Sequence, residues 1–158
     1  MDVCIILGSK SDMPVCDKCT SVLSNLEISH SVHIASAHRT PKHLESVIEN
    51  AINNDCKVFI GMAGMAAALP GVIASMTPLP VIGVPVGGAV PYDSLLSIVQ
   101  MPGGIPVGTL AIGEAGAKNA GILAAQIVGN HNDKIRQKVA KFRLEQTQSV
   151  LNNPYPDN

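Results

Sequence analysis

The chain has 158 residues, 46% of them hydrophobic and 15% charged, which is typical of one folded globular domain. A formal net charge of -1 and the lack of a basic stripe argue against a protein that grips nucleic acid through its phosphates. No uninterrupted apolar run reaches the roughly 18 residues of a membrane-spanning helix, and no basic leader precedes the first apolar run. We therefore expect a cytoplasmic protein that binds a small molecule and no membrane.

Aromatic side chains are scarce, with two Phe, two Tyr and no Trp in the chain. The core must therefore be built from aliphatic residues and Met, and a bound ring meets few aromatic faces on which to stack. This scarcity counts against a flavin-binding protein.

Apolar runs alternate along the chain with segments that carry helix signals, such as Asp12 before Pro14, or Pro41 before a periodic apolar pattern. One of these segments contains Pro70 and Gly71, which we expect to interrupt or restart its helix. In chain order the predicted elements are a strand (3–9), a helix (11–26), a strand (31–36), a helix (41–52), a strand (57–64), a helix (66–77), a strand (79–86), a helix (93–100), a strand (108–113) and a helix (117–129).

Strands of continuous Val, Ile and Leu character separated by helices predict a parallel sheet that is covered on both faces, with right-handed crossovers. The fold class is therefore α/β, a three-layer domain of flavodoxin-like or Rossmann-like type. No repeat or linker divides the chain, so residues 1–158 are expected to form a single domain.

The composition becomes more charged after Gly129 and predicts an extra C-terminal helix over 131–152. This helix has no obvious place in the core of a five-strand unit, so we expect it to pack across the domain or onto a neighbouring subunit. Two prolines then indicate a loose tail. The apolar stripe of the helix comprises Ile135, Val139, Phe142 and Val150, and the prolines are Pro154 and Pro156.

Ligands of such folds bind beyond the carboxyl ends of the strands, where the loops of several units meet. The unusual polar and glycine-rich segments of this chain all fall where such loops are expected, which makes that edge the candidate site. These segments are 8–12, 36–41, 61–71, 87–92 and 103–106.

The first of these loops carries Ser9, Ser11 and Asp12 at a strand-to-helix turn, where backbone N–H groups and hydroxyls can receive a phosphate. Asp12 is suited to sugar hydroxyls or to simple helix capping, and the two interpretations are equally weighted. The chain has neither of the glycine-rich fingerprints of dinucleotide and nucleoside triphosphate sites. A single phosphate, as on a ribonucleotide, fits better.

The second loop, "SAHRTP", places His38 beside Arg39. Imidazole exchanges protons near neutral pH, and guanidinium offers a planar fork of donors to a phosphate or carboxylate. In isolation the hexapeptide reads equally well as a capping turn with both side chains in solvent, with Thr40 as the helix cap before Pro41. The 61–71 loop has no acid-base side chain and offers close backbone approach and an apolar wall.

The remaining histidines and the four cysteines are expected to be structural. "CDKC" has the spacing of a redox pair or of half a zinc site, but Cys19 also has helical spacing to apolar neighbours, and no second pair completes a ligand set. We therefore expect no metal. The residues concerned are His30, His33, His43, His131, Cys4, Cys16, Cys19 and Cys56.

Taken in order and spacing, "GSKSD", "SAHRTP", "ALPG", "GVPV" and "SIVQMPGGIPVGTLAIG" resemble the catalytic subunit family of phosphoribosylaminoimidazole carboxylase, in its N5-carboxyaminoimidazole ribonucleotide mutase branch. The resemblance covers residues 2 to about 151. It implies a flavodoxin-like homo-octamer in purine synthesis that needs neither a metal nor an organic cofactor.

The resemblance also implies a mechanism in which the substrate's carbamate releases carbon dioxide, which stays in the pocket until C4 of the imidazole attacks it. His38 would supply a proton for the first step and remove the C4 proton afterwards. Arg39 and the Ser9 turn would hold the phosphate, and Asp12 the ribose. The remaining implied substrate contacts are Ser11, Ser36, Gly64, Ala66, Ala67 and Leu69.

A second branch of the family carboxylates aminoimidazole ribonucleotide directly, with a motif similar to "SAHKT", so Arg39 and Pro41 favour the mutase. Many mutases have a histidine before Leu-Pro-Gly, where this chain has Ala68, and Met62 and Met65 replace glycines in the same loop. The 87–95 segment is also shorter than its usual counterpart. Direct carboxylation and a non-catalytic nucleotide-binding module are therefore the alternatives.

Overall fold

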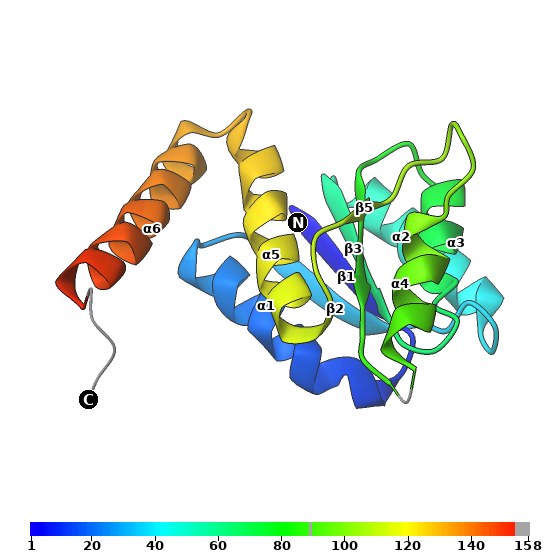
Figure 1. Ribbon diagram of the computed structural model, residues 1–158. Helices are drawn as coiled ribbons and strands as arrows, with labels where there is room; N and C mark the ends of the chain where they lie inside the picture. Colours follow the sequence, from blue (N-terminus) through cyan, green and yellow to red (C-terminus); the bar gives the residue numbers. More distant parts are fainter. Residues whose placement is uncertain (89, 154–158) are drawn as a thin grey trace.

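The computed structural model describes residues 1–88 and 90–153. Its centre is a parallel sheet with strand order β2-β1-β3-β4-β5, flanked by helices (Figure 1). The strands are β1 (Val3–Leu7), β2 (His30–Ile34), β3 (Val58–Ala63), β4 (Val81–Pro85) and β5 (Gly108–Thr109). The helices are the 3-10 turn η1 (Lys10–Asp12) and the α-helices α1 (Met13–Asn25), α2 (Pro41–Asn53), α3 (Leu69–Ser75), α4 (Pro91–Val99), α5 (Gly113–Gly129) and α6 (Asp133–Asn152).

Helices cover both faces of the sheet, which confirms the predicted three-layer α/β fold. α1 and α5 lie on one face and α2, α3 and α4 on the other (Figure 1). Along β1, Ile5 belongs to the core against α1 and α5, whereas Cys4 and Ile6 belong to the core against α2 and α3. Because every residue of β1 is buried, the strand reads as a continuous apolar run rather than an alternating one.

Two paired glycines let α3 and α4 approach the sheet closely. Gly61 of β3 lies beside Gly83 of β4. A Cβ at Gly83 would lie 2.4 Å from Cγ2 of Ile98, and one at Gly61 would lie 3.2 Å from Cα of Pro70. Pro70 lies in the first turn of α3, which begins at Leu69, and a proline at this position costs no helical hydrogen bond. The predicted helix start at residue 66 was wrong, and no interruption occurs, but Pro70 marks the start of the helix, in agreement with the alternative of a restart there.

The last strand is also shorter than expected. β5 pairs with β4 only through Gly108 and Thr109, and it is an edge strand of the described sheet. The chain leaves the sheet after Thr109 and turns at Gly113, whose φ of 64° is in the left-handed region that favours glycine. α5 consequently begins four residues before the predicted 117, and α4 begins at Pro91 rather than 93.

The C-terminal helix α6 packs on its own domain with its first half. Ile135 and Val139 are buried in the core on the α1 and α5 face, and Phe142 packs against it. The second half projects away from the sheet (Figure 1), and Val150 is 70% exposed. The expectation that α6 has no place in the core was thus wrong for its first two turns. The predicted tail at 154–158 lies outside the described residues.

None of the helices that the structure describes combines the length and the apolar character needed to cross a membrane.

Candidate functional site

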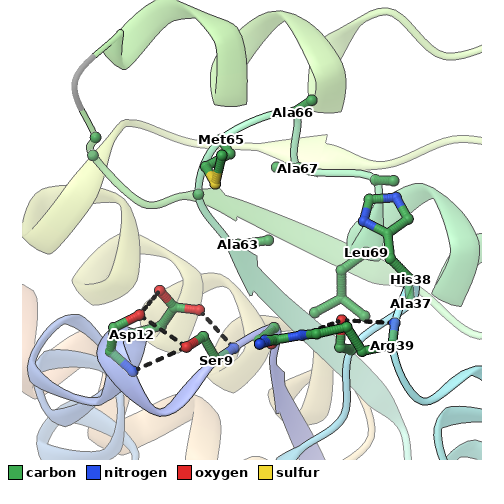
Figure 2. Close-up of a pocket in the computed structure, with 17 residues that line it drawn as sticks. Ser9, Asp12, Ala37, His38, Arg39, Ala63, Met65, Ala66, Ala67 and Leu69 are labelled. Carbon is green, nitrogen blue, oxygen red and sulfur yellow. Dashed lines mark hydrogen bonds between the residues drawn. The ribbon is translucent and has the colours of Figure 1, made fainter.

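A cavity of about 550 Å³ opens at the carboxyl edge of the sheet, lined by the loops that follow β1, β2, β3 and β4. In this strand order, the loops after β1 and β3 diverge to opposite faces and leave a crevice where such folds bind ligands. Every residue that the sequence singled out for substrate contact or catalysis lines this cavity (Figure 2): Ser9, Ser11, Asp12, Ser36, His38, Arg39, Gly64, Ala66, Ala67 and Leu69.

The loop after β1 is held by a reciprocal capping box. The backbone N–H of Ser9 donates to Oδ2 of Asp12 at 3.0 Å, while Oγ of Ser9 accepts from the N–H of Ser11 at 3.3 Å (Figure 2). The hydroxyl oxygens of Ser9 and Ser11 also lie within hydrogen-bond distance of each other, at 3.0 Å. Asp12 therefore completes the capping box of η1, although its side chain makes no capping bond to α1, and the box fixes its carboxylate at the cavity wall.

Burial raises the pKa of the Asp12 carboxyl above its ordinary value. Hydrogen bonds from the Ser9 N–H and the Ser11 hydroxyl, and the charge of Arg39, oppose this shift in part. At a pH above the raised pKa of the folded chain, the ionised Asp12 carboxylate therefore lowers the stability of the fold. At a pH below the ordinary pKa of the unfolded chain, this destabilisation is absent. A ligand hydroxyl that donates to the carboxylate would offset part of the lost hydration.

Arg39 connects the loops after β1 and β2. Its Nη2 donates to the carbonyl oxygen of Gly8 at 3.0 Å, and its Nε donates to Oγ of Ser36 at 3.4 Å. The backbone N–H of Arg39 donates to the same Oγ at 3.2 Å. A guanidinium has five N–H donors, so these two side-chain bonds hold it in place and leave three donors for an anion in the cavity.

Thr40 closes the loop after β2 instead of capping the next helix as predicted. Its Oγ1 accepts from the backbone N–H of Ser36 at 2.9 Å and donates to the carbonyl oxygen of Ser36 at 3.2 Å. Although Thr40 occupies the position before α2, its side chain makes no capping bond. The backbone groups of Ser36 lie beyond the last residue of β2, so they need partners outside the sheet; the Thr40 hydroxyl pairs with both of them, and the backbone N–H of Thr40 also donates to the Ser36 carbonyl oxygen at 2.9 Å.

His38 lies at the tip of this loop with its imidazole exposed and, within residues 1–88 and 90–153, without a hydrogen bond. Figure 2 shows the ring near Leu69 and Ala67, on the opposite side of the cavity from Asp12. The other four histidines do not line the cavity; they are His30 and His33 in β2, His43 in α2 and His131 between α5 and α6. Proton exchange near neutral pH at this cavity therefore falls to His38 among the described residues.

The loop after β3 forms the apolar wall, with three successive alanines and Leu69. Met65 begins this wall with a φ of 54°, a left-handed conformation that costs a residue with a side chain roughly 1 kcal/mol. Sequence reasoning noted Met65 in place of a glycine but did not assign it to the site. The glycine it replaces was the available signal, because glycine favours a positive φ.

The loop at 103–106 does not reach the candidate site. Gly104, Ile105 and Pro106 border a separate cavity with residues 79–82, which precede and begin β4. The loop follows α4 rather than a strand, so it lies at the amino edge of the sheet, and its assignment to the ligand edge was wrong. The 87–92 loop contributes Gly87 and Gly88 to the site, while Ala89 lies outside the described residues.

All four cysteines are buried and free. Burial raises the pKa of the Cys4 and Cys19 thiols to about 12 and that of Cys16 to about 11. Cys19 packs in the core, as predicted from its helical spacing. Among the residues that the structure describes, no three His, Cys, Asp or Glu side chains group so that they could hold a metal ion.

Comparison with known proteins identifies the family of the whole chain. The family model described as AIR carboxylase matches residues 2–149. The N5-carboxyaminoimidazole ribonucleotide mutase of Vibrio parahaemolyticus is 54% identical over 158 residues, covering 99% of this chain and 98% of the relative. The enzyme of the same name from Escherichia coli K12 is 51% identical over 156 residues, covering 98% and 92%.

The fold comparison agrees. The crystal structure of Treponema denticola PurE superposes with a TM-score of 0.87 at 29% identity, covering 96% of this chain and 94% of that one. A match over nearly the whole length, by sequence and by structure, includes all four loops that line the cavity. The chain belongs to the AIR carboxylase family.

Proposed function

We propose that this chain is an N5-carboxyaminoimidazole ribonucleotide mutase of purine biosynthesis, an isomerase that forms 4-carboxy-5-aminoimidazole ribonucleotide. The observation that carries the proposal is the 51–54% identity, over almost the entire chain, to relatives that bear this name. Substrate and product are isomers, because a carboxyl group moves from the exocyclic nitrogen to C4 while a proton moves the other way. The reaction therefore balances without an oxidant or another substrate.

The phosphate of the nucleotide binds between Arg39 and the Ser9 turn. In support, the guanidinium is held at 3.0 Å from the Gly8 carbonyl oxygen, so it faces the same turn that carries the two serine hydroxyls. Charge-assisted bonds from a planar guanidinium suit phosphate oxygens. Asp12 accepts hydrogen bonds from the ribose hydroxyls, which suits a buried carboxylate with an oxygen at the cavity wall.

The imidazole of the substrate then lies between His38 and the apolar wall. His38 donates a proton as the carbamate loses carbon dioxide, and afterwards it removes the proton from C4 once the new carbon–carbon bond has formed. One side chain can serve both steps, because it ends the first step as the base that the second step requires. The wall of alanines with Leu69 retains carbon dioxide near C4 and keeps water away.

Ala68 makes His38 the sole histidine in this scheme. Many family members have a histidine at this position, and Ala68 offers only a methyl group to the cavity. We propose that both proton transfers pass through His38, since no other imidazole among the described residues lines the cavity.

The deciding experiment supplies purified protein with either N5-carboxyaminoimidazole ribonucleotide or aminoimidazole ribonucleotide plus bicarbonate, and follows the 4-carboxy product. The mutase converts the first substrate efficiently and the second poorly. Product formed efficiently from the second mixture alone would make the chain a direct carboxylase. Binding of the nucleotide without turnover would make it a non-catalytic module.

Assembly and location belong to the same proposal. We infer a homo-octamer in the cytoplasm, in which the second half of α6 packs on a neighbouring subunit. In support, the end of that helix exposes apolar side chains, with Val150 at 70% and Leu151 at 63% exposure. Light scattering tests the assembly, and a monomer at micromolar concentration would refute it. Fractionation of the source cells tests the location.

A further inference from the structure

Met65 combines a strained backbone with an unpacked side chain. Its φ is 54°, and among the described non-glycine residues two others, Glu27 and Asp55, also have a positive φ. Those two residues follow α1 and α2 at turns into the next strand, where a positive φ is a usual way to end a helix. Met65 lies instead in a cavity wall between β3 and α3.

The folded chain recovers little of this strain through packing, because the Met65 side chain is 84% exposed. Figure 2 shows its sulfur directed from the loop into the space between the Asp12 and His38 sides of the cavity. An exposed apolar side chain in a strained conformation at a cavity is typical of a group that meets a ligand. Ligand binding would then bury surface that folding leaves exposed.

The part of the ligand that Met65 meets follows from the other walls. Polar groups gather on the side of Ser9, Asp12 and Arg39, and they suit the phosphate and the ribose. No Phe, Tyr or Trp side chain lines the cavity among the described residues, so apart from the His38 imidazole a ring finds no aromatic face on which to stack. A thioether is polarizable and makes favourable contacts with aromatic rings.

We propose that Met65 is a specificity-determining residue whose thioether packs on the imidazole ring of the bound ribonucleotide. This inference rests on the proposed function, because it takes the ring from that substrate. Met65 thereby supplies a packing surface for the ring in a cavity without Phe, Tyr or Trp, and it selects ligands that carry a ring over ligands that carry only ribose and phosphate.

The test compares two ligands on Met65→Gly by calorimetry. Aminoimidazole ribonucleotide should bind about tenfold more weakly than to the unmodified chain, equivalent to ~1.4 kcal/mol. Ribose 5-phosphate, which lacks the ring, should keep its Kd within about twofold. Met65→Leu retains apolar volume and should keep the Kd of the ring-bearing ligand within about threefold.

Met76→Gly is the matched control, since Met76 is 40% exposed at the end of α3 and does not line the cavity. It should bind both ligands as the unmodified chain does. Met65→Gly should unfold at no lower temperature, because glycine relieves the positive φ. Equal weakening of both ligands, or weakening of neither, would overturn the ring contact. If the unmodified chain binds neither ligand, the proposed function fails instead.

Discussion

Replacement of His38 by Asn is the sharpest test of the proposed chemistry. Asparagine keeps a polar group of similar reach that can donate and accept hydrogen bonds, but its amide does not exchange protons near neutral pH. His38 is exposed and has no hydrogen-bond partner among the described residues, so its loss should change the free energy of unfolding by no more than about 0.5 kcal/mol. Any loss of activity is then a loss of chemistry rather than of folding.

The expected loss is large, because both proton transfers are assigned to one side chain. General acid-base catalysis contributes about 100-fold to 10,000-fold in rate, or roughly 3–5 kcal/mol of the barrier. With two steps affected, kcat of His38→Asn should fall by at least the upper part of this range, until turnover is no longer measurable. Nucleotide affinity should stay within about tenfold, or ~1.4 kcal/mol.

The assay follows formation of the 4-carboxy product from N5-carboxyaminoimidazole ribonucleotide, with calorimetry for binding and thermal unfolding for stability. His43→Asn is the matched control, because His43 lies on α2 away from the cavity. It should retain kcat within about twofold. Near-normal turnover by His38→Asn would refute the acid-base assignment, whatever the control does.

Three further predictions follow from the described contacts. Arg39→Ala should weaken nucleotide binding by about tenfold to 100-fold, as expected for ~1.5–3 kcal/mol from a charge-assisted bond, and an unchanged Kd in calorimetry would show that Arg39 does not hold the phosphate. Gly83→Ala should lower the free energy of unfolding in urea by about 1–3 kcal/mol, because its Cβ would lie 2.4 Å from Cγ2 of the buried Ile98; an unchanged midpoint would mean that α4 shifts freely. Burial raises the pKa values of the thiols of Cys4, Cys16, Cys19 and Cys56, so an aromatic disulfide reagent at pH 8 should label them only in denaturant. Rapid labelling of the native chain would contradict this burial.

The sequence alone determined the fold class, because its signals are local. A strand buried on both faces must be apolar at every position, and β1 is. A proline in the first turn marks where a helix begins, as it does at Pro41 and Pro70. The last residue of β5 and the start of α5 escaped prediction, because 108–113 carries strand-forming residues of which only Gly108 and Thr109 pair with β4.

The location of the candidate site was also predictable, because the carboxyl ends of parallel strands share one edge. That rule places Ser9, Asp12, His38 and Arg39 at one edge from the sequence alone, and the structure brings them together in one cavity there. It failed for 103–106, since a glycine-rich loop after a helix looks like one after a strand until the element boundaries are known.

The tertiary structure alone decided how the site residues are held. The Arg39 guanidinium reaches the carbonyl oxygen of Gly8 across 31 positions of sequence, and Thr40 turns from its expected capping role to the backbone of Ser36. The direction of the Met65 side chain also depends on a backbone conformation that its residue type disfavours. Local sequence signals indicate which residues approach the edge of the sheet, but packing between distant loops sets the distances on which binding and proton transfer depend.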